Sequence, residues 1–136
     1  MVKVYAYVAG DIPHFGHLRA LQQAKELGDY LIVGVLTDEA IEAYKRKPII
    51  PFNERFEWFA NLKCVDEVVP QYNVDPTDNL KKLSDIDILV HGDDWGEDFP
   101  GAEYMRSIGK TAIRTKYYPH QSTTKIIKQI KARDDL

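Results

Sequence analysis

Residues 2–36, VKVYAYVAGDIPHFGHLRALQQAKELGDYLIVGVL, contain the pattern that decides the fold class. The segment 2–8 is rich in β-branched and aromatic side chains, which predicts a strand. Apolar residues then recur at helical spacing, at Leu18, Leu21, Ala24 and Leu27. They predict a helix over 15–27, with Gly28 as its C-cap. The continuous apolar run 30–36 is typical of a strand that is buried in a parallel sheet.

The rest of the chain continues this alternation of strands and helices. We expect helices over 37–44, 53–62, 75–83, 103–108 and 123–132, and strands over 65–69, 86–90 and 111–117. Asn53 is the expected N-cap of the second of these helices. Right-handed crossovers between parallel strands give an α/β fold with helices on both faces of the sheet. We therefore predict a single domain over 1–136, built on a Rossmann-like open parallel sheet of about five strands.

The composition excludes several classes of function. The chain has 136 residues, of which 44% are hydrophobic and 29% charged, as in an ordinary soluble domain. Its net charge of −3 argues against a broad basic surface for nucleic acid or an anionic membrane. Cys64 is the only cysteine, so neither a disulfide framework nor a cysteine metal site is expected. The sequence has no membrane-spanning run and no secretion signal, and we expect a cytoplasmic protein.

Polar segments are expected at one edge of the predicted sheet. In open α/β sheets, ligands bind beyond the carboxyl ends of the strands. The segments 10–17, 91–95 and 119–124 fall at that edge, and the basic loop 45–47 can fold over it. The stretch Ser122-Thr123-Thr124 allows two interpretations. It is a helix cap, or its hydroxyl and N–H groups bind the β- and γ-phosphates of a nucleotide.

Two histidines, His14 and His17, lie at the start of the first predicted helix. A helix N-terminus offers unpaired N–H groups and partial positive charge, which suit a phosphate. Gly16 leaves room for a phosphate to approach the backbone. Imidazole N–H groups at this place can stabilise the charge that grows during nucleotidyl transfer. An ordinary helix start and a metal site remain as alternatives, although no third metal ligand has a recognisable spacing.

At these residues the chain resembles the cytidylyltransferase family, from about Val4 to Ile127. The resemblance is greatest to the glycerol-3-phosphate branch, and the ethanolamine-phosphate and choline-phosphate branches are also similar. Its motifs are the H-x-G-H signature at 14–17, the second strand with the turn after it at 28–39, Asn53-Glu54-Arg55, the third strand at 65–70, and Gly92-Asp93-Asp94-Trp95. Val90-His91-Gly92 is similar to the ethanolamine-phosphate branch.

The resemblance implies roles for the matching residues. His14 and His17 would contact the triphosphate and stabilise the transition state, and Lys45 or Arg46 would steady the phosphates of both substrates. Asp94 and Trp95 would help to form the cytidine pocket. Arg55 would organise the basic loop or the adjoining strand, and Asp38 is a second supporting residue. The other implied nucleotide-binding positions are Ala9, Gly10, Asp11, Phe15, Gly16, Gly92, Asp93, His120, Gln121, Ser122, Thr123 and Thr124.

The chain departs from the family pattern at three places. The usual G-T-F-D is Val8-Ala9-Gly10-Asp11, and the usual R-T-x-G-I-S-T-T is residues 117–124 when it is aligned without a gap. That alignment replaces the arginine of the motif by Tyr117, and only three extra loop residues would restore it as Arg114. One lysine of the glycerol-3-phosphate pattern falls on Tyr44.

The reaction that the resemblance implies is transfer of CMP from CTP to a small phosphorylated alcohol, with Mg²⁺ on the triphosphate. Glycerol 3-phosphate is the first expected acceptor, followed by phosphoethanolamine, phosphocholine or a phosphonate. A homodimer is also expected, with Phe56, Trp58 and Phe59 in the core or at an interface. Two alternatives are an adenylyltransferase of the FAD synthetase type and a module that binds a nucleotide without catalysis.

Overall fold

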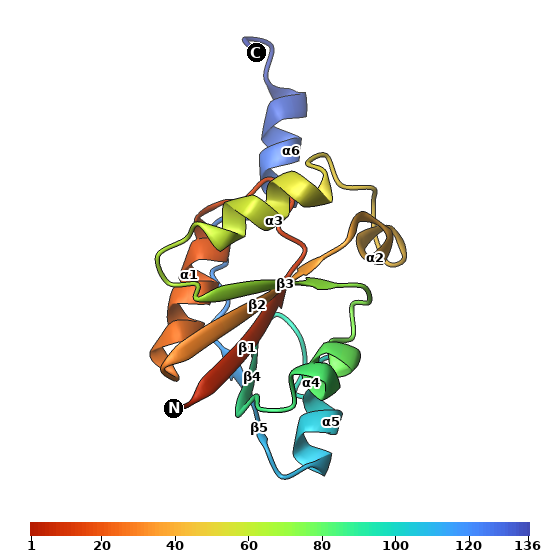
Figure 1. The fold of residues 1–136 in the computed structure, drawn as a ribbon. Helices are drawn as coiled ribbons and strands as arrows, with labels where there is room; N and C mark the ends of the chain where they lie inside the picture. The colour runs from red at the N-terminus through yellow and green to blue at the C-terminus, as the bar shows by residue number, and fades with distance from the viewer.

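The computed structural model describes residues 1–136 and is built on one five-stranded parallel sheet (Figure 1). Its strands are β1 (Lys3–Val8), β2 (Tyr30–Leu36), β3 (Glu67–Gln71), β4 (Ile88–Gly92) and β5 (Thr111–Thr115). They lie in the order β3-β2-β1-β4-β5, and every neighbouring pair is parallel. The chain builds one half of the sheet outward from β1 and then returns to build the other half beginning with β4. The carboxyl ends of β1 and β4 therefore flank a topological switch point.

Helices cover both faces because successive strand residues point to opposite sides of the sheet. On one face, Val4 and Ala6 pack in a cluster with residues of α1 (Phe15–Glu26) and α3 (Phe52–Ala60). On the other face, Tyr5 packs with residues of α4 (Thr77–Leu83) and α5 (Ala102–Ser107). The short helix α2 (Asp38–Glu42) follows β2. The predicted Rossmann-like α/β fold is confirmed.

Some element boundaries differ from the prediction. The helix expected to begin at a capping Asn53 begins one residue earlier, with Pro51 as its N-cap, so the predicted Asn53 cap is wrong. Strands β3 and β4 each begin two residues later than expected. Val65 and Ile86 are buried, which explains their apolar character, but neither pairs with a neighbouring strand. The remaining predicted elements are present, within a few residues at each end.

Gly28 has a different role from the one predicted. Helix α1 ends at Leu27, which is its C-cap in the right-handed helical region, and Gly28 does not adopt the left-handed conformation of a glycine cap. A Cβ atom on Gly28 would lie 2.7 Å from Cγ2 of Val4 and 2.8 Å from the carbonyl oxygen of Val2. Glycine is required here because the chain passes close to the start of β1.

Helix α6 (Thr123–Ala132) is the least packed element. Figure 1 shows it extending away from the sheet, with the C-terminus at its far end, and none of its residues is buried. In α3 the aromatic residues divide: Phe59 is buried in the core, whereas Trp58 is 45% exposed. None of the helices combines the length and the apolar character that crossing a bilayer requires.

Candidate functional site

A cavity of about 400 Å³ opens at the carboxyl ends of β1, β4 and β5, at the switch point of the sheet. The N-termini of α1 and α6 both border it. Most of the predicted site residues line it together: Ala9, His14, Gly16, His17, Lys45, Arg46, Gly92, Asp94, Trp95, Gln121, Ser122, Thr123 and Thr124. Segments that are far apart in the sequence thus meet in one place.

His14 and His17 form a reciprocal cap at the start of α1. The backbone N–H of Gly16 donates to Nδ1 of His14 at 3.0 Å, and the backbone N–H of His14 donates to Nδ1 of His17 at 3.2 Å. The two ring centroids are 4.0 Å apart. Since each Nδ1 accepts a hydrogen bond, it carries no proton, and the proton of each neutral ring is on Nε2. The pair therefore has two unused Nε2–H donors.

Burial keeps both imidazoles uncharged. The pKa of His17 is lowered to about 3, mainly by burial and also by the neighbouring His14 and Lys45, while Asp11 opposes the shift. Burial also lowers the pKa of His14. At neutral pH both rings are thus neutral donors, in a site where Lys45 and Arg46 also line the cavity. Burial and the neighbouring Arg46 lower the pKa of Lys45 as well.

The start of α6 is tied to the start of α1. The hydroxyl of Ser122 accepts from the backbone N–H of Lys125 at 3.1 Å, so the capping interpretation of this segment is confirmed. The hydroxyl of Thr123 donates to the carbonyl oxygen of Asp11. The two helix N-termini are therefore held side by side at the cavity, and a contact between Ser122-Thr123-Thr124 and phosphate remains a prediction.

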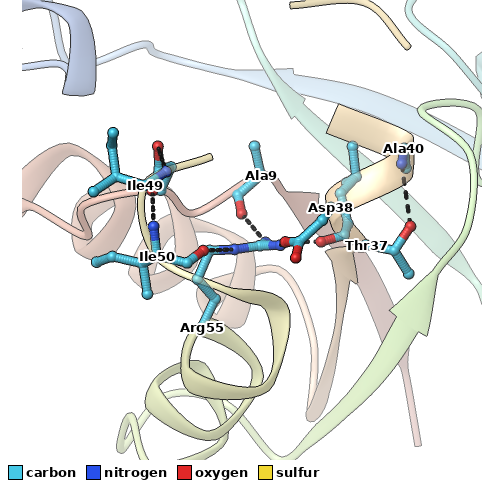
Figure 2. A network of polar contacts seen from close by, with 9 residues as sticks. Ala9, Thr37, Asp38, Ala40, Ile49, Ile50 and Arg55 are labelled. Atoms are coloured by element: carbon cyan, nitrogen blue, oxygen red, sulfur yellow. Dashed lines mark hydrogen bonds and ion pairs between the residues drawn. The ribbon is translucent and has the colours of Figure 1, made fainter. Parts of the chain in front are cut away.

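Arg55 connects the loops behind the cavity (Figure 2). Its side chain is fully buried. It donates to the carbonyl oxygens of Ile50 at 2.9 Å, Ala9 at 2.6 Å and Leu36 at 2.7 Å, and pairs with the carboxylate of Asp38 at 2.7 Å. One guanidinium thus joins the ends of β1 and β2, the start of α2 and the loop that precedes α3.

Asp11 and Gly10 were predicted to bind the nucleotide, but neither lines the cavity. The buried carboxylate of Asp11 accepts from the backbone N–H groups of Ile49 and Ile50 at 2.9–3.1 Å, and so fixes the end of the basic loop. Gly10 has a φ of +72°, and a Cβ atom there would overlap the ring of Phe59. Both residues therefore stabilise the turn between β1 and α1 without lining the cavity.

Phe15, Asp93 and His120 also lie outside the cavity lining. Phe15 is 51% exposed and packs edge-on against Tyr118 at 5.1 Å, and His120 packs against the same ring at 5.2 Å. The carboxylate of Asp93 accepts from the backbone N–H of Tyr117 at 2.8 Å. These three residues support the rim of the cavity.

Tyr7, Tyr44 and Lys116 line the cavity although no site role was predicted for them; His91 also lines it, as expected of the polar segment 91–95. The ring of His91 lies 5.2 Å from Tyr7, 5.6 Å from Trp95 and 5.4 Å from Phe99, between centroids. Tyr7 lines the cavity because β1 and β4 are neighbours, a fact that no local pattern reports. For Lys116 no signal is apparent.

Two residues, Arg114 and Tyr117, could occupy the position of the family arginine, and they lie in different surroundings. Arg114 donates to the carbonyl oxygen of Trp95 at 3.1 Å and pairs with Glu97 at 3.7 Å, outside the cavity lining. Tyr117 lines the cavity.

A second cavity, of about 580 Å³, lies between α2 and the segment that follows β3. Tyr44 lines both cavities, so they are neighbours. The second cavity contains three carboxylates, from Glu39, Asp75 and Asp78, and no lysine, arginine or histidine. Its electrostatic character is therefore opposite to that of the first, which Lys45, Arg46 and Lys116 line with Asp94 as the single acid.

No three His, Cys, Asp or Glu side chains are grouped so as to hold a metal ion. The interpretation of His14 and His17 as metal ligands therefore gains no third ligand from the residues around them. The acid nearest to them in sequence is Asp11, and its carboxylate already accepts hydrogen bonds from the backbone N–H groups of Ile49 and Ile50.

Comparisons with known proteins agree on one family. The profile of the cytidylyltransferase-like family matches residues 11–129. Ethanolamine-phosphate cytidylyltransferase of Arabidopsis thaliana is 44% identical over 97 residues, which are 68% of this chain and 23% of that protein. The chain thus spans less than a quarter of that relative. Glycerol-3-phosphate cytidylyltransferase of Bacillus subtilis is 34% identical over 133 residues, 96% of this chain and 98% of the relative.

A solved structure shares the fold. The lipopolysaccharide core biosynthesis protein of Thermoplasma volcanium superposes with a TM-score of 0.74 at 30% identity, over 87% of this chain and 99% of that one.

Proposed function

The chain belongs to the cytidylyltransferase-like family of nucleotidyltransferases, and from this premise we propose that it transfers CMP from CTP to a small phosphorylated alcohol and releases pyrophosphate. One observation carries the proposal. Two neutral histidines with free Nε2–H groups stand at the N-terminus of α1, in a cavity that the N-terminus of α6 also borders. Such donors suit an α-phosphate whose negative charge increases in the transition state.

The proposed step is an in-line displacement. An oxygen of the acceptor phosphate attacks the α-phosphorus of CTP and forms a new P–O bond. The bond from the α-phosphorus to the bridging oxygen breaks, and pyrophosphate leaves with the electron pair. The attacking oxygen is already anionic at neutral pH, so no general base is required. Positioning and charge stabilisation by His14 and His17 supply most of the catalysis.

Mg²⁺ enters this reaction as part of the substrate, MgCTP. Magnesium retains several waters and is usually held by phosphate oxygens and at most a few carboxylates. Mg²⁺ neutralises only part of the negative charge of the triphosphate. The first cavity has a net positive lining, because Lys45, Arg46 and Lys116 line it with one acid, Asp94. These cations offset the charge that remains on the triphosphate.

Glycerol 3-phosphate is the first acceptor to test, since the relative of that name matches over nearly its whole length. The second cavity favours another candidate, a phosphorylated amino alcohol such as phosphoethanolamine. Its carboxylates, from Glu39, Asp75 and Asp78, and the rings of Tyr44 and Tyr72 would attract an ammonium group. The phosphate of such an acceptor would lie by Lys45, and its amine would extend past Tyr44.

The experiment is pyrophosphate release with Mg²⁺, from CTP and separately from ATP, across glycerol 3-phosphate, phosphoethanolamine, phosphocholine and small phosphonates. We expect release that requires CTP and one of these acceptors. Release from ATP alone would instead establish the adenylyltransferase alternative. CTP binding by calorimetry without release for any acceptor would support the binding-module alternative.

The choice of acceptor has its own test. If phosphoethanolamine is the acceptor, Asp75→Asn with Asp78→Asn should lower kcat/KM for it by about tenfold, the scale of one weakened charge interaction. The KM for CTP should stay within about twofold, because neither residue lines the first cavity. An unchanged kcat/KM would place the amine elsewhere.

A further inference from the structure

Two large aromatic rings, Trp95 and Tyr117, stand exposed at the first cavity. Trp95 is 43% exposed and Tyr117 is 40% exposed, and both line the cavity. The ring of Trp95 has an edge contact with His91 at 5.6 Å, while the ring of Tyr117 packs against no other aromatic ring. A solvent-exposed tyrosine ring in a cavity, without a packing partner of its kind, has a face available to a planar ligand.

Hydrogen bonds join the two chain segments that carry these rings. The carboxylate of Asp93 accepts from the backbone N–H of Tyr117 at 2.8 Å, and the backbone N–H of Asp93 donates to the carbonyl oxygen of Thr115 at 2.8 Å. Arg114 donates to the carbonyl oxygen of Trp95 at 3.1 Å. The turn 92–95 and the segment 114–117 are therefore joined at three points, and the two aromatic side chains are presented from one joined unit.

The surroundings of Tyr117 are those of a nucleoside rather than a triphosphate. A Cβ atom on Gly92 would lie 3.6 Å from the ring of Tyr117 and 2.6 Å from a carboxylate oxygen of Asp94. Burial raises the pKa of the Tyr117 hydroxyl, and the Asp94 carboxylate adds to this effect. The phenol is thus neutral at physiological pH and lies by an acid, which would repel phosphate oxygens.

We propose that Tyr117 binds the pyrimidine ring of the nucleotide by stacking, and that this position makes no contact with the triphosphate. The inference rests on the proposed function. It differs from what the motif alignment implies, since the aligned position carries an arginine in the family pattern. In this chain the triphosphate is left to the two helix N-termini and to the cationic loop, whereas Tyr117 and Trp95 hold the base.

The test separates base binding from phosphate binding. Calorimetry measures the affinities of MgCTP, CMP and inorganic pyrophosphate for the wild type, Tyr117→Ala and Tyr117→Phe. Removing one stacked base contact costs about tenfold or more in affinity. We expect Tyr117→Ala to lower the affinities for CTP and CMP by that same factor and to leave the affinity for pyrophosphate unchanged. Tyr117→Phe, which retains the ring, should bind all three as the wild type does.

Two further variants control the test. Trp58→Ala removes an equally exposed aromatic ring from outside both cavities and should change none of the three affinities. Tyr117→Leu retains bulk without a ring and gives the same readout if the alanine variant fails to fold.

Each contrary outcome is distinct. Loss of pyrophosphate affinity in Tyr117→Ala, or unchanged CMP affinity, would overturn this inference and leave the proposed function standing. A wild-type protein that binds neither CTP nor CMP would overturn both.

Discussion

The first cavity is bordered by two helix N-termini, which are capped in the same way but belong to helices that pack very differently against the rest of the protein. Both α1 and α6 begin with a side chain that caps the backbone, His14 in one and Ser122 in the other. Helix α1 buries Leu21 and Ala24 in the core, whereas α6 buries none of its residues and extends from the sheet. Elements with few buried apolar contacts open locally at a lower free energy. On the proposed function, the well-packed helix α1 would therefore carry the reactive histidines, and the less stable α6 would complete the phosphate site.

The largest effect should come from the rigid helix. His17→Ala removes a donor that is held in position by the backbone, and we expect turnover to fall about a hundredfold or more, as when an oxyanion donor is lost. Steady-state kinetics of pyrophosphate release measure it. Arg19→Ala, on the exposed side of the same helix, should be close to wild type. Near-normal turnover in folded His17→Ala would contradict the proposed site.

The same histidine makes stability depend on pH. Its pKa is about 3 in the folded state against 6.5 as the ordinary value. Between these values the unfolded chain binds a proton that the folded protein does not, so stability falls as pH falls. The slope from this group approaches about 1.4 kcal/mol per pH unit. Urea unfolding from pH 7 to pH 4 should show a smaller decline in His17→Asn than in the wild type. Parallel declines would mean that His17 is protonated when folded.

The link between the two helices should have a moderate effect. Thr123→Val removes the hydroxyl that donates to the carbonyl oxygen of Asp11. A neutral hydrogen bond is worth about 1 kcal/mol, so the KM for CTP should rise about fivefold with kcat nearly unchanged. Lys128→Ala, further along α6, is the control. A fall in kcat as large as that of His17→Ala would show that the start of α6 takes part in the chemical step.

The smallest signal concerns the free protein. Amide hydrogen exchange should be faster in α6 than in the second half of α1, and CTP should protect the first turn of α6 more than any part of α1. Equal exchange in the two helices would remove the distinction between them.

Local patterns predicted the central elements well and the pairings between distant segments poorly. The strand and helix periods of residues 2–36 placed β1, α1 and β2 because each pattern is set by residues near one another in the chain. The role of Asp11 was missed because its partners, Ile49 and Ile50, lie nearly forty residues away. His91 and Tyr7 meet only because β4 pairs with β1, and strand order has no local signal.

The position of β3 at the edge of the sheet has a consequence for how this enzyme family can diversify. The segment after β3 lines the second cavity. The strands whose ends form the first cavity, β1, β4 and β5, lie in the middle and on the other side of the sheet. Substitutions at the exposed positions Tyr72, Asp75 and Asp78 of this segment therefore leave the central strands unaltered. On the proposed function, mutation could therefore change acceptor specificity with little effect on the fold, while the nucleotide-binding site stays the same.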